Sequence, residues 1–557
     1  MKIKNFHVNL PAIIGLTIQF FMKKTFWIII FMVMTTTMKA GDNPFFNPFS
    51  TPHGTAPFDK IKTEHYEPAF EKAIAEHQQE INAIADNPEP PTFANTIEAM
   101  EYSGEMLNRV SNVFFNLLSA ESNDEMMKIS QRLSPKLSEH ANNIYLNEKL
   151  FEKIKSIYNN RLNQGLTSEQ VRLVEKYYQD FESSGATLSP EDKEKYRQLS
   201  MKLSLATLDF GQNVLKETNK YEMLLTDKTD LEGLPESVLE AAKARAKTKG
   251  KEGWLFDLSA PSYTSFMKYS TRRDLREKLY RAYNTKCVTG GEFDNQENVK
   301  KIVNLRLEIA NLLGYENYAE YVLKYRMAKN TEGVYGLLDK LADAYTPVAK
   351  KEVDDVQAYA LKVEAKPIEI QPWDWSFYAD KLKDERFKLN DEMLRPYFEL
   401  EQVKKGVFGL ATNLYGLQFV KNPDIPVYHP EVEAFDVLDE NGQFLAVLYT
   451  DFHPRPGKQS GAWMTEFKGQ WIKDGVDSRP HVSLVMNFTR PTETKPALLT
   501  FDEVETFLHE FGHALHGMLS RCTYESLSGT NVYRDFVELP SQIMENWLTE
   551  KEYLDQF

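Results

Sequence analysis

Residues 499–520 read LTFDEVETFLHEFGHALHGMLS, and this stretch predicts one amphipathic helix. Thr500 and Glu503 have the Thr-x-x-Glu spacing of a capping box, in which each side chain accepts a hydrogen bond from the other residue's backbone amide. Leu499 before the cap and Val504 after it fit a hydrophobic staple. Further apolar residues recur at helical spacing on one face, namely Val504, Phe507, Leu508, Phe511, Leu515, Met518 and Leu519. We therefore expect a helix over 501–520 that buries this face.

Two histidines project from the other side of the expected helix. At about 100° per residue, His509 and His513 fall roughly 140° and 180° from Val504. Imidazoles one turn apart can bind one metal ion, and Glu510 between them is placed to accept a proton from water. An isolated pair of this spacing is more often a solvated surface, but the enclosed glutamate favours a zinc peptidase site. Gly512 narrows the helix, which either ligand access or the approach of a second helix explains.

A catalytic zinc ion takes three protein ligands and leaves one position for water. Glu538 is the favoured third ligand, because the turn-like run Ser526-Leu-Ser-Gly-Thr530 can bring a second helix back beside the first. That second helix has an expected apolar face made of Ile543, Met544, Trp547 and Leu548. Spacing alone does not exclude three rival carboxylates, which belong to Glu525, Asp535 and Glu545.

These residues carry a resemblance to a known family. His509-Glu-Phe-Gly-His-Ala-Leu-His516, the following Ser-Gly-Thr, and Asp535-Phe-Val-Glu-Leu-Pro-Ser-Gln542 resemble the thimet oligopeptidase family of zinc peptidases. Upstream, Asp451-Phe-His-Pro-Arg-Pro-Gly-Lys458 and Gly461-Ala-Trp-Met464 resemble the segment before the metal-binding helix in that family. The match runs from about Asn43 to the last residue and is nearest to the bacterial peptidyl-dipeptidases (dipeptidyl carboxypeptidases) of the family.

The resemblance implies a site, a fold and a reaction. It assigns His509, His513 and Glu538 as ligands of one Zn2+ ion and Glu510 as the catalytic base. It implies a predominantly α-helical, two-lobed zincin-type peptidase, with a deep central channel and a small β-sheet near the metal helix. Such a channel admits short unfolded peptides as substrates and excludes folded proteins.

The expected activity is zinc-dependent release of C-terminal dipeptides from short peptides. No residue identified from the sequence separates this activity from that of an endo-acting oligopeptidase of the same family. A third alternative is a non-catalytic, zinc-containing peptide-binding fragment, although the intact Glu510 argues against a purely structural metal site.

The end of the chain carries a further expectation. Residues 540–557 are still in a helical pattern, with no glycine stop. Members of the resembled family continue beyond their third ligand and contribute tyrosine and histidine groups that contact the substrate. The resemblance therefore implies that this 557-residue chain is C-terminally incomplete, and it leaves the activity of these residues open.

Composition narrows the possible partners. The net charge of −15 argues against nucleic acid or an anionic membrane surface as a partner. Hydrophobic residues make up 42% and charged residues 26%, which is ordinary for a soluble globular protein. Cys287 and Cys522 are the two cysteines of the sequence, so there is no disulfide framework and no cysteine metal site. The sequence does not indicate an oligomeric state.

The N-terminus resembles a secretory signal. Met22-Lys-Lys is followed by an apolar core over 25–34, and Ala40 can precede a cleavage point. We expect Met22 to be the initiator, export to the periplasm, and no stable membrane association after cleavage. A cytoplasmic chain and an uncleaved membrane anchor are the alternatives.

We predict three parts along the chain. Residues 1–40 form an upstream extension and signal peptide, 41–255 a helical N-terminal region, and 256–557 the zinc peptidase region. Periodicity is helical from Lys62 to Lys216, and the clearest strand candidates are 444–449 and 482–488. An edge strand there could bind an extended substrate, but the pattern slightly favours core strands.

Overall fold

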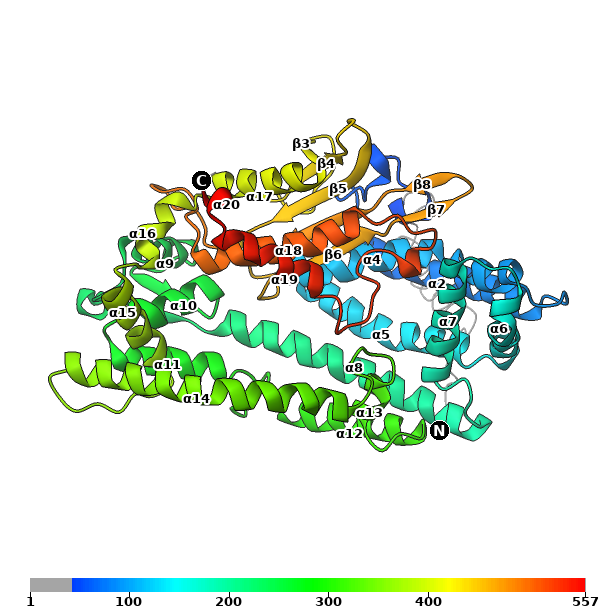
Figure 1. The fold of residues 1–557 in the computed structure, drawn as a ribbon, viewed down its shortest axis with the longest axis horizontal. Helices are drawn as coiled ribbons and strands as arrows, with labels where there is room; N and C mark the ends of the chain where they lie inside the picture. Colours follow the sequence, from blue (N-terminus) through cyan, green and yellow to red (C-terminus); the bar gives the residue numbers. More distant parts are fainter. Residues whose placement is uncertain (1–42, 556–557) are drawn as a thin grey trace, which may run out of the picture.

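The computed structural model describes residues 43–555, which form a predominantly α-helical fold with a small sheet, as the sequence predicts (Figure 1). The predicted signal segment lies outside these residues. Within the described part of the chain, no helix is both long and apolar enough to cross a membrane.

Long helices fill the N-terminal region, in agreement with the predicted periodicity. The first ends at Asp86, where Asn87-Pro-Glu-Pro-Pro follows, and the last begins behind the Ser189 cap with Pro190 in its first turn. These helices are α2 (Tyr66–Asp86), α3 (Ala99–Glu101), α4 (Glu105–Ala120), α5 (Asp124–Tyr145), α6 (Glu148–Asn160), α7 (Ser168–Ser183) and α8 (Pro190–Lys220).

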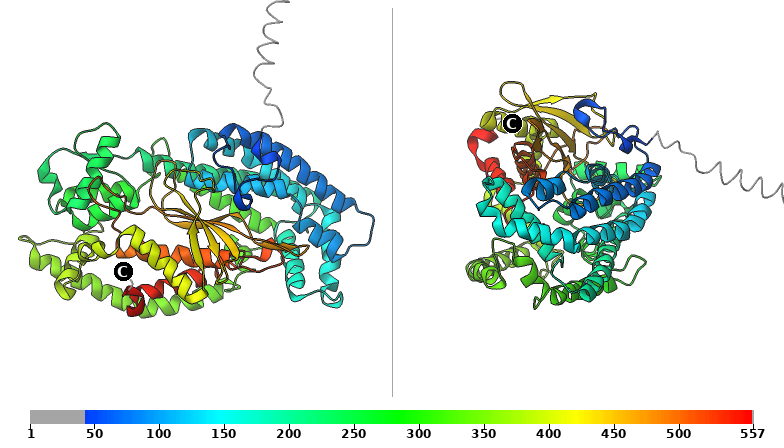
Figure 2. Two further views of the ribbon diagram at one scale, coloured as in Figure 1. Left: turned by 90° about the horizontal axis from the view of Figure 1, so that it is seen from above. Right: turned by 90° about the vertical axis from the view of Figure 1, so that its right-hand side faces the viewer.

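A second group of helices begins at a small two-stranded antiparallel sheet, β1 (Met223–Leu225) with β2 (Trp254–Phe256), and the first helix of the group lies between these two strands in the sequence. In the side view of Figure 2, the sheet, the N-terminal helices and the green helices α12 to α14 form successive layers. This second group comprises α9 (Glu236–Thr248), α10 (Ala260–Tyr269), α11 (Arg273–Asn284), α12 (Gln296–Leu312), α13 (Tyr318–Leu323), α14 (Thr331–Val363), α15 (Trp375–Phe387), α16 (Asp391–Leu394) and α17 (Leu400–Tyr415).

A five-stranded sheet forms the centre of the C-terminal region. Its spatial order is β3 (Gln418–Lys421), β4 (Glu433–Leu438), β5 (Phe444–Asp451), β9 (His481–Val485) and β6 (Trp463–Lys468). Strands β5 and β9 pair in parallel, and the other pairs are antiparallel. Both predicted strand candidates are therefore interior strands, and the two edge strands are β3 and β6. A small hairpin joins β7 (Trp471–Lys473) to β8 (Val476–Ser478).

Both faces of the sheet are covered, which explains why β5 reads as a continuous apolar run. Ala446 and Leu448 point into a core shared with α17 and with α18 (Phe501–Met518). Val447 and Tyr449, which alternate with them, point into a second core shared with α2 and α4. The sheet thus anchors α18 on one face and the N-terminal helices on the other.

Helix α18 has the capped, amphipathic form predicted for 501–520. The Thr500 side chain accepts from the Glu503 amide, and the Glu503 carboxylate accepts from the Thr500 amide at 2.9 Å. Leu499 and Val504 are fully buried in the same core, as a hydrophobic staple requires. The helix ends two residues earlier than predicted, at Met518. A shorter helix, α19 (Leu539–Glu545), runs alongside it, followed by α20 (Lys551–Leu554) (Figure 1).

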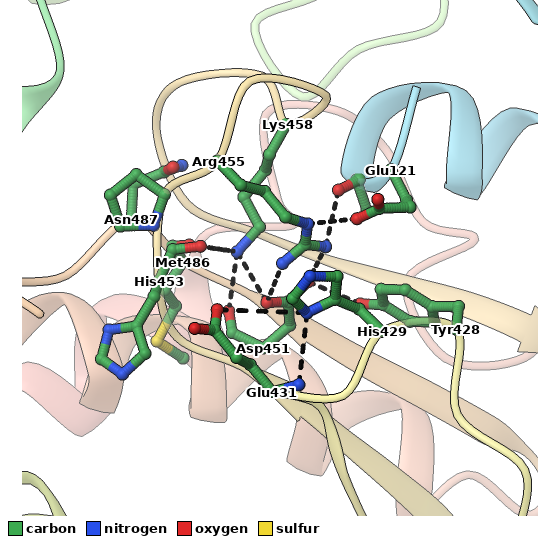
Figure 3. Close-up of polar contacts among 12 residues, drawn as sticks. Glu121, Tyr428, His429, Glu431, Asp451, His453, Arg455, Lys458, Met486 and Asn487 are labelled. Carbon is green, nitrogen blue, oxygen red and sulfur yellow. Dashed lines mark hydrogen bonds and ion pairs between the residues drawn. The ribbon is translucent and has the colours of Figure 1, made fainter. Parts of the chain in front are cut away.

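A buried ionic cluster holds the loop between β5 and β6 (Figure 3). Lys458 donates to the Asp451 carboxylate at 2.7 Å and to the carbonyls of His453 and Met486. Arg455 forms two bonds to Asp451, at 2.7 and 2.8 Å, and also pairs with Glu121 of the N-terminal region. The cluster therefore joins the loop that leads into the edge strand to the helical layer behind it.

Candidate metal centre

Two helices bring three metal-binding side chains together. His509 and His513 lie on the face of α18 that is turned away from the sheet core, and Glu538 is the residue directly before α19. Glu538 Oε2 lies 3.2 Å from His509 Nε2 and 3.1 Å from His513 Nε2. One ligand atom from each of the three residues lies within 4.8 Å of the others. The described residues contain no other group of three or more metal-binding side chains that meets this criterion.

The three rival carboxylates have other partners. Glu525 accepts a hydrogen bond from the Gly469 amide, and Asp535 accepts from two amides between α13 and α14. Glu545 lies at the site but contacts the far side of an imidazole, with its Oε1 2.6 Å from His509 Nδ1. Of the four carboxylates, Glu538 is thus the one that faces both Nε2 atoms.

The approach of α19 to α18 depends on Gly512. A Cβ atom at this position would lie 2.5 Å from the Pro540 carbonyl oxygen and 2.6 Å from Ser541 Cα. Both distances are far below van der Waals contact, so a side chain would hold the two helices apart. Of the two explanations open at the sequence level, the close approach of a second helix accounts for this glycine.

Hydrogen bonds behind the three side chains orient them. When Nδ1 of His509 carries the proton that bonds Glu545, Nε2 keeps its lone pair towards the centre of the site. Ser541 Oγ donates to Glu538 Oε2 at 2.9 Å. The sequence pattern did not identify either contact, although Ser541 and Glu545 lie three and seven residues after Glu538, at helical spacing. The predicted apolar face is only partly correct, because Met544 and Leu548 are buried while Ile543 is 58% exposed.

The electrostatics suit a metal site with an adjacent base. Glu510 is 6% exposed, and burial, reinforced by the nearby Glu538 carboxylate, raises the pKa of Glu510 above its usual range. Burial lowers the pKa of His513, which favours the neutral imidazole that binds metals. A glutamate with a raised pKa beside three convergent ligands is suited to accepting and releasing a proton near neutral pH.

The donor set fits a catalytic zinc ion. Two imidazole nitrogens and one carboxylate oxygen are a ligand set found in zinc hydrolases, and three protein ligands leave a position for water. Ligands bound at about 2.1 Å in a tetrahedral arrangement lie roughly 3.4 Å apart. The two nitrogen-to-oxygen separations of 3.1 and 3.2 Å are close to that value.

Comparisons with known proteins agree with this geometry. The family model described as Peptidase family M3 matches residues 266–557. Dipeptidyl carboxypeptidase of Escherichia coli (strain K12) is 38% identical, over 92% of this chain and 76% of that protein. Oligopeptidase A of Salmonella typhimurium is 37% identical, over 92% of this chain and 75% of that protein.

A solved structure assigned as an oligoendopeptidase F has a similar fold, with a TM-score of 0.50 and 16% identity. The superposition covers 89% of this chain and 72% of that one. The resemblance to the thimet oligopeptidase family is thereby confirmed, including its similarity to dipeptidyl carboxypeptidases. The chain belongs to peptidase family M3 and is a peptide-hydrolysing metalloenzyme.

Proposed function

We propose that this chain is a zinc-dependent peptidase that releases dipeptides from the C-terminus of short, unfolded peptides. The observation that carries the proposal is the convergence of His509, His513 and Glu538 beside the buried Glu510. An ion bound by these three residues would supply Lewis-acid polarisation of the scissile carbonyl and acidification of water.

Glu510 performs the proton transfers. Its carboxylate accepts a proton from the attacking water and then passes it to the leaving amine. Because burial raises the pKa of Glu510, the protonated form between these two steps is accessible near neutral pH.

Residues that contact the candidate ligands keep the ligand side chains in their orientation. Glu545 holds the ring of His509, and Ser541 holds the Glu538 carboxylate. Partners of this kind orient ligands and sustain metal affinity. Gly512 allows the Glu538 helix to lie close enough for all three side chains to meet.

The position of the cleaved bond is tested by one peptide prepared with a free and with an amidated C-terminus. Relatives named as dipeptidyl carboxypeptidase and as oligopeptidase A are 38% and 37% identical, so identity alone does not choose between them. We expect strong preference for the free form and a dipeptide product by mass spectrometry. Internal cleavage of both forms at equal rates would support an endo-acting oligopeptidase. Zinc binding without hydrolysis of either form would support a peptide-binding protein instead.

We also propose export to the periplasm, supported by the charged start at Met22 and the apolar core over 25–34. A reporter enzyme fused after Ala40 should be found in the periplasm. Retention of the reporter in the cytoplasm would contradict export.

A further inference from the structure

The three candidate ligands are held very differently. His509 and His513 belong to an 18-residue capped helix that packs on the sheet. Glu538 lies at the cap position of a seven-residue helix, and its side chain is 48% exposed. A side chain at the frayed end of a short helix needs an additional restraint to stay in place.

That restraint is supplied three residues earlier, by Asp535. Its two carboxylate oxygens accept from the Met327 and Ala328 amides, each at 3.0 Å. Bonds from the Val537 amide to Tyr533 and from the Leu539 amide to Phe536 carry the turn from Asp535 into α19. Asp535 and Glu538 are therefore part of one hydrogen-bonded turn.

The donor side of this contact is itself rigid. Lys329 adopts a positive φ of 68°, and a Cβ on Gly333 would lie 2.3 Å from the Ala328 carbonyl oxygen, so the turn before α14 is tightly folded. Just upstream, Tyr321 donates to the Ser183 carbonyl at 3.0 Å, and Lys324 pairs with Glu182 at 2.7 Å. The two amides thus point from a fixed part of another layer.

Glu538 consequently lies between two fixed points. Before it, Asp535 is tied to the turn between α13 and α14; after it, Pro540 and Ser541 pack on Gly512. We propose that Asp535 is a positioning residue for the metal centre, which keeps Glu538 turned towards His509 and His513. The inference rests on the proposed zinc site.

Without the contacts of Asp535, Glu538 should leave its position in a fraction of the chains. The affinity for Zn2+ should fall in proportion to that fraction. We expect Asp535→Ala to raise the Kd for Zn2+ by about tenfold, the lower end of the range for groups that orient ligands. Asp535→Asn retains one acceptor oxygen and should give an intermediate Kd.

Zn2+ affinity of the full chain, measured by competition with a chromogenic chelator, tests the proposal. Asp294→Ala is the matched control, because Asp294 also accepts from two backbone amides, those of Gly290 and Gln296, within its own loop. The visible spectrum of the Co2+-substituted chain adds a readout of the coordination sphere. Asp535→Ala should shift that spectrum towards the spectrum of Glu538→Ala, while the metal-free melting temperature stays near that of Asp294→Ala.

Wild-type zinc affinity and an unchanged cobalt spectrum in Asp535→Ala would overturn the positioning role, as would equal weakening by Asp294→Ala. If Asp535→Ala does not fold, Asp535→Asn decides by the same criteria. A different result marks failure of the proposed function: the wild-type chain does not bind zinc, or Glu538→Ala binds it as tightly as wild type.

Discussion

Gly512→Ala tests how closely the two ligand-bearing helices must approach. The new Cβ would lie 2.5 Å from the Pro540 carbonyl oxygen and 2.6 Å from Ser541 Cα, where ordinary contact begins at 3.4 Å. Both neighbours are backbone atoms that cannot rotate away, so α19 must retreat by about 0.9 Å. Metal-ligand distances tolerate only about 0.2 Å, so Glu538 would lose its bonding distance.

We expect Gly512→Ala to raise the Kd for Zn2+ at least tenfold. Overpacking should lower the free energy of unfolding by roughly 1–2 kcal/mol, after the usual gain of an alanine in a helix is subtracted. Isothermal titration and urea denaturation measure the two effects.

Gly211→Ala in α8 is the matched control, since no atom other than the neighbouring backbone of its own helix lies within 4 Å of its expected Cβ. This variant should gain roughly 0.5–1 kcal/mol of stability and bind zinc as wild type does. Unchanged zinc affinity in Gly512→Ala would show that the two helices tolerate a side chain between them, and that the metal site does not require their close approach.

Three further predictions concern groups around the site and the core. Glu545→Gln weakens the carboxylate contact to His509 Nδ1 and should raise the Kd for Zn2+ by about 10–100-fold, measured by chelator competition. Lys458→Met leaves the fully buried Asp451 without one of its two cations and should lower the free energy of unfolding by about 3–5 kcal/mol in urea. Burial and the charge of Glu525 raise the pKa of Glu466 to about 7, so the folded chain loses stability as pH rises from its unfolded pKa through that value. The free energy of unfolding of Glu466→Gln, relative to that of wild type, should therefore increase by about 1–3 kcal/mol from pH 5 to pH 8, measured by urea denaturation.

Exposed residues provide the controls for these variants. Glu550→Gln replaces an exposed glutamate near α20 and should leave zinc affinity unchanged. Lys551→Met removes an ion pair whose lysine side chain is 81% exposed and should cost under about 1 kcal/mol. If Lys458→Met lowered the free energy of unfolding by no more than Lys551→Met does, the buried cluster would not be what holds the loop between β5 and β6 to the helical layer. A parallel pH profile in Glu466→Gln and wild type would contradict the raised pKa.

Local patterns in the sequence predicted the first half of the candidate site. The Thr500–Glu503 capping box, the apolar stripe and the separate histidine face all depend on residues within the single stretch 499–520, and all three are present in α18. The pattern likewise slightly favoured core positions for the strands at 444–449 and 482–488, and β5 and β9 are indeed a parallel pair in the interior of the sheet.

Features that depend on long-range contacts could not be predicted from the sequence pattern. Edge strand β6, Trp463–Lys468, is mostly half-buried and mixes polar with apolar residues, so no clear alternation marks it. Spacing could not rank Glu538 against Asp535 or Glu545, since the choice depends on how α19 folds back on Gly512. The role of Asp535 depends on two amides more than 200 positions earlier in the chain, a separation from which no local pattern arises.

The central assignment is Glu510 as the base of a three-ligand zinc site. Zinc content and hydrolysis of a quenched peptide, measured together on wild type and on Glu510→Gln, test it. We expect equal zinc per chain in both and a fall in kcat/KM of about 10²–10⁴-fold in the variant, the usual contribution of a general base. Near-normal turnover by Glu510→Gln, or loss of its zinc, would contradict the assignment.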